Sequence, residues 1–73
     1  MAVAKGIITN QIRRLRFEHD EMTQAALAAA AGVTRHTIMA LEANKYAPSL
    51  ELAFRIAAVF GEPLEAVFQY RAQ

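Results

Sequence analysis

Residues 23–46 have the sequence TQAALAAAAGVTRHTIMALEANKY, and this stretch decides the fold. Two helix-forming segments, 24–31 and 35–43, lie on either side of Gly32. Thr23 and Thr34 stand where helix N-caps are favoured, and a glycine between helices adopts the left-handed conformation that permits a sharp turn. The stretch therefore predicts two short helices joined by a tight turn.

The spacing of apolar residues indicates which face of each helix points inward. Leu27 and Val33 would fill the wedge between the two helices, and Ala28 is small enough for the second helix to pass close above it. Ile38 and Leu41 would anchor the second helix to the core. Its outward face then carries a polar first turn followed by a small residue, as a helix entering the major groove of DNA needs: Arg35, His36, Thr37 and Ala40. The pattern predicts a DNA-binding helix-turn-helix over 24–44, with the recognition helix starting at Thr34.

Capping residues, Gly and Pro predict five short helices in one domain spanning 1–73, and thus an all-α fold. We expect a first helix from about Ile8 or Asn10 to His19 and a third helix that ends at Asn44, which suits a left-handed stop. Ser49 caps a fourth helix over 50–60, which stops at Gly61, and Pro63 starts a fifth helix through Phe68. We find no alternating segment of strand length and expect residues 71–73 to fray.

Composition narrows the classes of function. The chain has no cysteine, and its two histidines, His19 and His36, lack any recognisable ligand spacing, so we expect neither a metal nor another cofactor. Residues 1–10 carry no apolar run typical of a signal peptide, and no stretch approaches the roughly 20 apolar residues of a membrane span. We therefore expect a cytoplasmic protein that does not contact a membrane.

Charge is segregated along the chain although the formal net charge is only +1. Residues 1–17 contain basic side chains and no acid, whereas Glu18, Asp20 and Glu21 follow directly. A local basic face can attract phosphate on a nearly neutral protein. Arg13 and Arg14 could contribute to such a face or simply be solvated.

The chain resembles the Cro/CI-type helix-turn-helix family, also called the XRE family, of transcriptional regulators. The resemblance covers nearly the whole chain, with these segments in the family's order: IRRLR (12–16), MTQAALA (22–28), GVTRHTI (32–38), LEANKY (41–46) and PSLELAFRIAAVFGEPLEAVF (48–68). It implies a compact five-helix lambda-repressor-like DNA-binding domain. It also implies a transcriptional regulator that usually binds a palindromic operator of double-stranded DNA as a homodimer.

Three departures from the family pattern stand out. Alanines at 26 and 29–31 replace charged or larger apolar residues, Asn44 replaces the usual glycine, and the stretch HDEM (19–22) is one residue longer than the common turn. These changes leave the fold intact but weaken the expectation of phosphate contacts from the second helix.

The resemblance and the helix geometry together suggest DNA contacts. Gln24 resembles a glutamine that contacts a phosphate and braces the recognition helix, although its position also suits simple capping. Thr34 offers a hydroxyl and free backbone N–H groups as a phosphate seat. Arg35 would bind guanine or a phosphate, and Thr37 a thymine methyl or a phosphate. His36 stands where the family often has glutamine, so we expect it at a base edge.

Two further pairs complete the expected site. Asn44 and Lys45 would meet the DNA backbone after the recognition helix, Lys45 as a salt-sensitive charge contact. The family residues equivalent to Arg16 and Glu42 form an ion pair, so these two are expected to make a structural salt bridge.

The segment 50–60 is more apolar than one buried face requires, because only Glu51 and Arg55 are polar. Together with Leu64, Val67, Phe68 and Tyr70, the surplus indicates either a surface covered in a homodimer or a helix surrounded by core on every side.

Three other functions fit the sequence less well. An enzyme is disfavoured, because the chain lacks cysteine and a glycine-rich phosphate loop and is too small for a substantial pocket. The serious alternative is an antitoxin-like or other protein-interaction module, in which the same fold binds a protein partner. A dedicated partner-binding tail would mark such a module, and none is visible. A helix-turn-helix that has lost DNA binding would carry acidic or bulky apolar residues at 35–37. The expected function is a sequence-specific, DNA-binding repressor.

Overall fold

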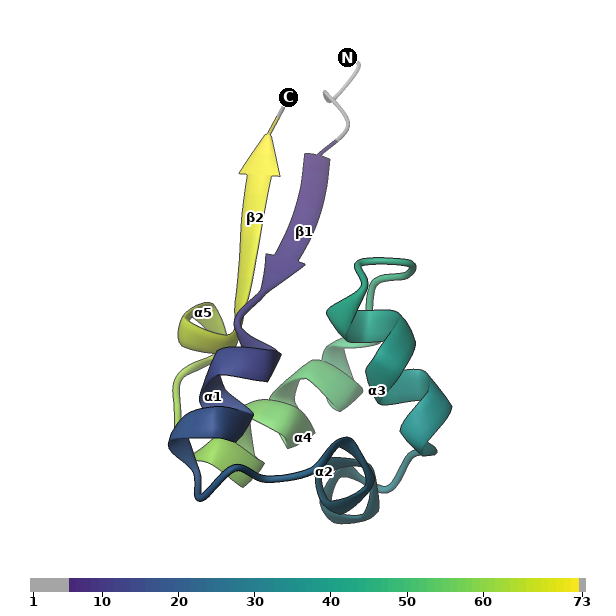
Figure 1. The fold of residues 1–73 in the computed structure, drawn as a ribbon. Helices are drawn as coiled ribbons and strands as arrows, with labels where there is room; N and C mark the ends of the chain where they lie inside the picture. Colours follow the sequence, from purple (N-terminus) through teal and green to yellow (C-terminus); the bar gives the residue numbers. More distant parts are fainter. Residues whose placement is uncertain (1–5, 73) are drawn as a thin grey trace.

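The computed structural model describes residues 6–72, which form five helices and one two-stranded sheet (Figure 1). The helices are α1 Ile12–Glu18, α2 Gln24–Ala31, α3 Arg35–Glu42, α4 Leu50–Phe60 and α5 Leu64–Val67. The strands are β1 Gly6–Asn10 and β2 Phe68–Ala72, which pair antiparallel as a ribbon that stands away from the helices (Figure 1).

The core gathers around α4, whose Ile56 is fully buried. The predicted inward residues Leu27, Ile38 and Leu41 are 0%, 0% and 1% exposed, so the predicted apolar pattern of the two central helices is confirmed. Leu50 on α4 is 67% exposed, and the idea of a helix surrounded by core on all sides is therefore wrong. The other core residues are Ile12, Leu15, Ala28, Ala31, Leu52, Ala57, Phe60 and Val67.

The predicted helix boundaries follow from capping. The side chains of Thr23, Thr34 and Ser49 accept hydrogen bonds from the backbone N–H groups three residues further on. At the end of α3, Asn44 takes the left-handed conformation with φ 57°, as predicted. The N–H of Lys45 donates to the Ala40 carbonyl oxygen at 2.9 Å, and this bond closes the last turn as a Schellman motif.

The structure is mostly helical, but the all-α prediction missed the two-stranded ribbon of β1 and β2. Ile8, expected on the first helix, lies in β1 opposite Tyr70, and α1 starts only at Ile12. The fifth helix ends at Val67 rather than Phe68, which begins β2. Residues 71 and 72, expected to fray, pair with β1, whereas residue 73 lies outside the described part.

The turn between α1 and α2 contains two successive left-handed residues, Asp20 and Glu21, with φ 57° and 53°. His19 supports this turn, because its ring nitrogens lie 2.8 Å from the Leu15 carbonyl oxygen and 3.1 Å from that of Phe60. The turn thus accommodates the longer stretch 19–22. Within residues 6–72, no helix is long and apolar enough to cross a membrane.

Candidate nucleic-acid interface

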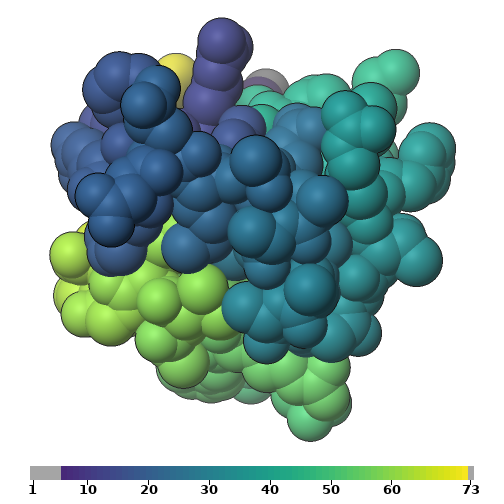
Figure 2. Space-filling view, turned by 60° about the horizontal axis from the view of Figure 1, so that its bottom comes forward, coloured from purple at the N-terminus to yellow at the C-terminus, as the bar shows by residue number. Residues whose placement is uncertain are grey.

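The predicted recognition helix, α3, is held by its inner face and open on its outer face. Ile38 and Leu41 are buried, whereas Arg35 and His36 are exposed and Thr37 and Ala40 are half-buried. Seen from below, α2 lies between α1 and α3 on the molecular surface (Figure 2). The arrangement presents the first turn of α3 to a partner while the core fixes the helix axis.

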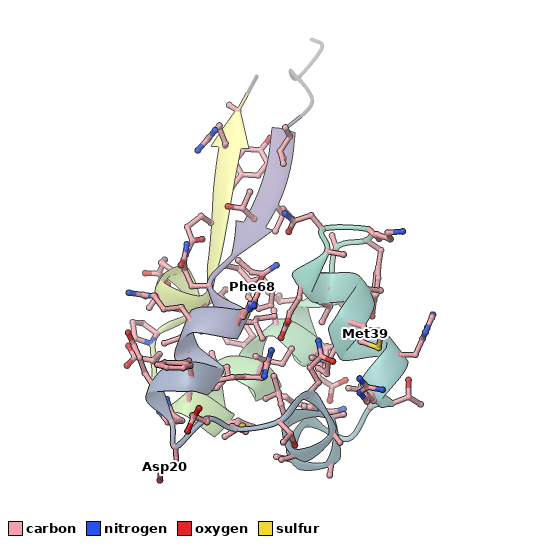
Figure 3. The ribbon with its side chains drawn as sticks, in the orientation of Figure 1. Asp20, Met39 and Phe68 are labelled. Atoms are coloured by element: carbon pink, nitrogen blue, oxygen red, sulfur yellow. The ribbon has the colours of Figure 1, made fainter. Side chains whose placement is uncertain are left out.

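Met39 is an outer residue of α3 that the sequence analysis did not include. It is 42% exposed and lies on the front of α3 in Figure 3. The helical period could have identified it, because Met39 follows His36 by three positions and so shares its face. The outward surface of α3 therefore combines polar groups at its start with a flexible apolar side chain one turn later.

Two threonines organise the N-terminus of α3. The Oγ1 of Thr34 accepts a hydrogen bond from the N–H of Thr37 at 3.2 Å, and the two hydroxyl oxygens lie 3.1 Å apart. The first backbone N–H groups of a helix have no partner within the helix and attract anions. The start of α3 thus offers hydroxyl and amide donors on an exposed surface.

A hydrogen-bond network joins α1, α2 and α3 behind this surface. Arg16 Nε lies 2.7 Å from Glu42 Oε2 and its NH2 group lies 3.1 Å from Oε1, which makes a two-pronged ion pair between α1 and the end of α3. Gln24 Nε2 donates to the same Glu42 at 3.2 Å, and Arg16 also donates to the Met22 carbonyl. Gln24 is therefore tied to the last turn of α3 and keeps its amide oxygen and a second N–H free to act.

Asn10, at the end of β1, is the second residue that sequence reasoning missed. Its Nδ2 donates to the Leu41 carbonyl at 2.8 Å and to Asn44 Oδ1 at 3.0 Å, while its Oδ1 accepts from the Ile12 N–H. It thus connects the ribbon, the start of α1 and the end of α3. The sequence carried no sign of this role, because the contacts reach residues more than thirty positions away.

Charged residues are distributed unevenly around α3. Arg13, Arg14 and Lys45 are exposed. Arg14 lies 3.9 Å from Glu18 in a solvent-exposed pair. Arg13 and Arg14 both line an open hollow that Glu42 also lines. Asp20, in the acidic cluster, lies at the tip of its turn on the opposite side of the molecule from α3 (Figure 3). Asp20 therefore lies away from α3, whereas Glu21 lines the same hollow as Glu42 at the end of α3.

Within residues 6–72, no three His, Cys, Asp or Glu side chains are grouped to hold a metal. A family model described as "Helix-turn-helix" matches residues 12–67, which is most of the chain. The protein belongs to this family, in its XRE-type branch.

Relatives come from archaea and bacteria. An uncharacterized HTH-type transcriptional regulator of Methanocaldococcus jannaschii is 48% identical over 61 residues, which cover 84% of this chain and 91% of that protein. One of Bacillus subtilis is 39% identical over 59 residues, with 81% and 88% coverage. A crystal structure of a candidate DNA-binding protein from Bacteroides fragilis matches 86% of this chain and 100% of that chain with a TM-score of 0.75. At 24% identity, this last match supports the fold alone.

Proposed function

We propose that this protein is a sequence-specific DNA-binding transcriptional repressor that inserts α3 into the major groove. Its membership of the helix-turn-helix family and the names of its relatives support a DNA-binding regulator. The observation that carries the proposal is the exposed first turn of α3, which is polar outside and anchored inside by Ile38 and Leu41. No catalytic step is part of this function.

Base edges would be contacted from the outer face of α3. Arg35 can donate two hydrogen bonds to guanine, and His36 can donate to or accept from a base edge. Thr37 and Met39 can pack against a thymine methyl group. Ala40, one turn after His36, leaves room for the bases to approach the helix.

Phosphate groups would be contacted at both ends of α3. Thr34 lies at its start with its hydroxyl and the neighbouring backbone N–H groups, and Gln24 is hydrogen-bonded to Glu42 at its end. Asn44 and Lys45 follow its end and are exposed. Contacts from both sides would fix the depth and angle of α3 in the groove.

The operator is proposed to be a palindrome read by a homodimer. A two-fold protein presents two recognition helices about 34 Å apart, which is one turn of DNA. Repression would result because the bound dimer covers promoter DNA. The relatives reported above come from archaea and bacteria, whose chromosome lies in the cytoplasm, and we propose this compartment for the protein.

Selection from a randomised duplex library at two salt concentrations tests the proposal. We expect enrichment of a short palindrome, with an affinity that falls steeply as salt rises. Lys45→Ala should weaken binding on every sequence and reduce the salt slope by about 1. A folded protein that enriches no sequence would refute DNA recognition and favour a protein-interaction module.

A further inference from the structure

One apolar face of the molecule is not explained by the core or by the proposed DNA contacts. It lies where the ribbon meets α5 and the first turn of α4, and we name it the ribbon–α4 face. It is lined by Ile8, Leu50, Ala53, Leu64, Phe68 and Tyr70. Leu50 and Tyr70 are 67% and 63% exposed, and Phe54, one turn beyond Leu50, is 54% exposed.

We infer that the ribbon–α4 face is the surface on which a second copy of this chain docks. The inference rests on the proposed function, since a palindromic operator requires a two-fold protein. The first argument is shape: Leu50 and Tyr70 protrude beside a hollow that Ala53, Leu64 and Phe68 help to line. A surface that carries both protrusion and hollow can complement itself across a two-fold axis, as an isologous interface requires.

The second argument is area. Full-sized apolar side chains expose on the order of 150–250 Å² each, so burying the exposed parts of Ile8, Leu50, Phe54 and Tyr70 would remove roughly 400 Å² from each copy. A standard interface needs about 800 Å² per partner. Four side chains would thus supply about half of a stable interface before the half-buried lining residues and backbone are included.

The third argument is charge and position. Glu65 is the one charged residue among those lining the hollow, so two copies can approach with little repulsion. Pro48, in the loop that follows α3, also lines it. The face therefore adjoins the C-terminal end of α3, and Asn10 bonds that end to the ribbon. Docking here would hold the two recognition helices in a fixed relation.

A partner on this face would also stabilise the ribbon. Among the described residues the sheet has two strands, and an isolated two-stranded ribbon is marginally stable in water. The alternation of β2 places Phe68 and Tyr70 on the side of this face and Arg71 on the other side. The other side of the ribbon carries Ile7, which is 42% exposed, beside Arg71, so the aromatic side chains of the ribbon lie on the side of the proposed partner.

Sedimentation equilibrium of the free protein, followed over a wide concentration range, tests this interface. Leu50→Glu places a carboxylate in the first turn of α4, where acids favour the helix, so it disturbs the face without disfavouring the fold. Tyr70→Glu is a second variant on the ribbon. Phe17→Glu is the matched control, because Phe17 is 69% exposed but lies on α1, away from the face.

We expect a wild-type dimer, a self-association weakened at least tenfold in Leu50→Glu and Tyr70→Glu, and a Phe17→Glu variant that behaves as wild type. Circular dichroism confirms that each variant keeps its helices. A monomeric wild type, or a dimer that only Phe17→Glu weakens, would overturn the inference. A dimer broken by Leu50→Glu in a protein that selects no DNA sequence would keep the interface and refute the DNA function instead.

Discussion

At the scale of single residues, the proposed DNA contacts of α3 can be separated from its fold. Arg35 is exposed and Thr37 half-buried, and neither belongs to the core. Arg35→Ala or Thr37→Ala should therefore lower operator affinity by about 1–3 kcal/mol wherever a base contact is lost. Fluorescence anisotropy with the selected operator measures the affinity, and thermal unfolding measures the stability.

The matched control is Arg55→Ala, since Arg55 is an exposed arginine on α4 that is paired with Glu51. This change should leave operator affinity unaltered. If Arg35→Ala lowered the unfolding temperature as much as the affinity, its assignment as a DNA contact would be refuted.

The ion pair between Arg16 and Glu42 acts on stability rather than on recognition. Its side chains are only 16% and 11% exposed, so Arg16→Met would leave a poorly solvated carboxylate without its counter-charge. We expect a loss of about 3 kcal/mol in the free energy of unfolding. Urea denaturation measures this loss, and replacing both residues with Met should cost less than the sum of the single changes.

Arg14 and Glu18 provide the comparison for this prediction. Their side chains are 58% and 52% exposed and 3.9 Å apart, so Arg14→Ala should cost less than about 1 kcal/mol. If Arg14→Ala and Arg16→Met lowered the free energy of unfolding equally, the burial of the Arg16–Glu42 pair would have no energetic consequence.

At the scale of elements, the five helices were predictable and the ribbon was not. Helix ends are set locally: Thr34 bonds a group three residues away, and Asn44 closes α3 through its own backbone conformation. The ribbon is set by distant pairing, since Ile8 and Tyr70 are 62 positions apart (70 − 8). A five-residue strand whose partner lies at the other end of the chain leaves only a weak alternating pattern in the sequence.

The same reasoning applies to the candidate site. The outward residues of α3 follow from helical period and capping, which are local. Gln24 was expected to brace α3 or cap α2, and the structure shows a bond to Glu42 that spacing could not reveal. Asn10 escaped prediction because it was assigned to the start of a helix, whereas it ends β1 and bonds to the distant Leu41.

The connection between ribbon and recognition helix can be tested at Asn10. Asn10→Ala removes the donor to the Leu41 carbonyl and to Asn44 Oδ1, and should lower the free energy of unfolding by about 1–2 kcal/mol. Asn10→Asp keeps the size but sets a carboxylate against those two acceptors, so it should be more destabilising than alanine. Urea denaturation of both variants measures this order, and the reverse order would show that the amide donor is unimportant.

At the scale of the whole molecule, the proposed dimer constrains the DNA as well as the protein. Two recognition helices fixed by one interface can enter the major groove together only when both half-sites lie on one side of the duplex. Inserting about 5 base pairs between the half-sites turns them by half a helical turn and should reduce affinity to that of a single half-site. Gel-shift titration on the selected operator measures this effect.

An insertion of about 10 base pairs places both half-sites on the same side of the duplex again, but it separates them by another full turn, roughly 34 Å. A dimer joined through the ribbon–α4 face cannot stretch to that span, because each ribbon is tied to its α3 by the bonds of Asn10. We therefore expect the longer spacer to bind as weakly as the shorter one. Full affinity with the longer spacer would indicate two independent monomers or a flexible connection between them, and would contradict a rigid dimer.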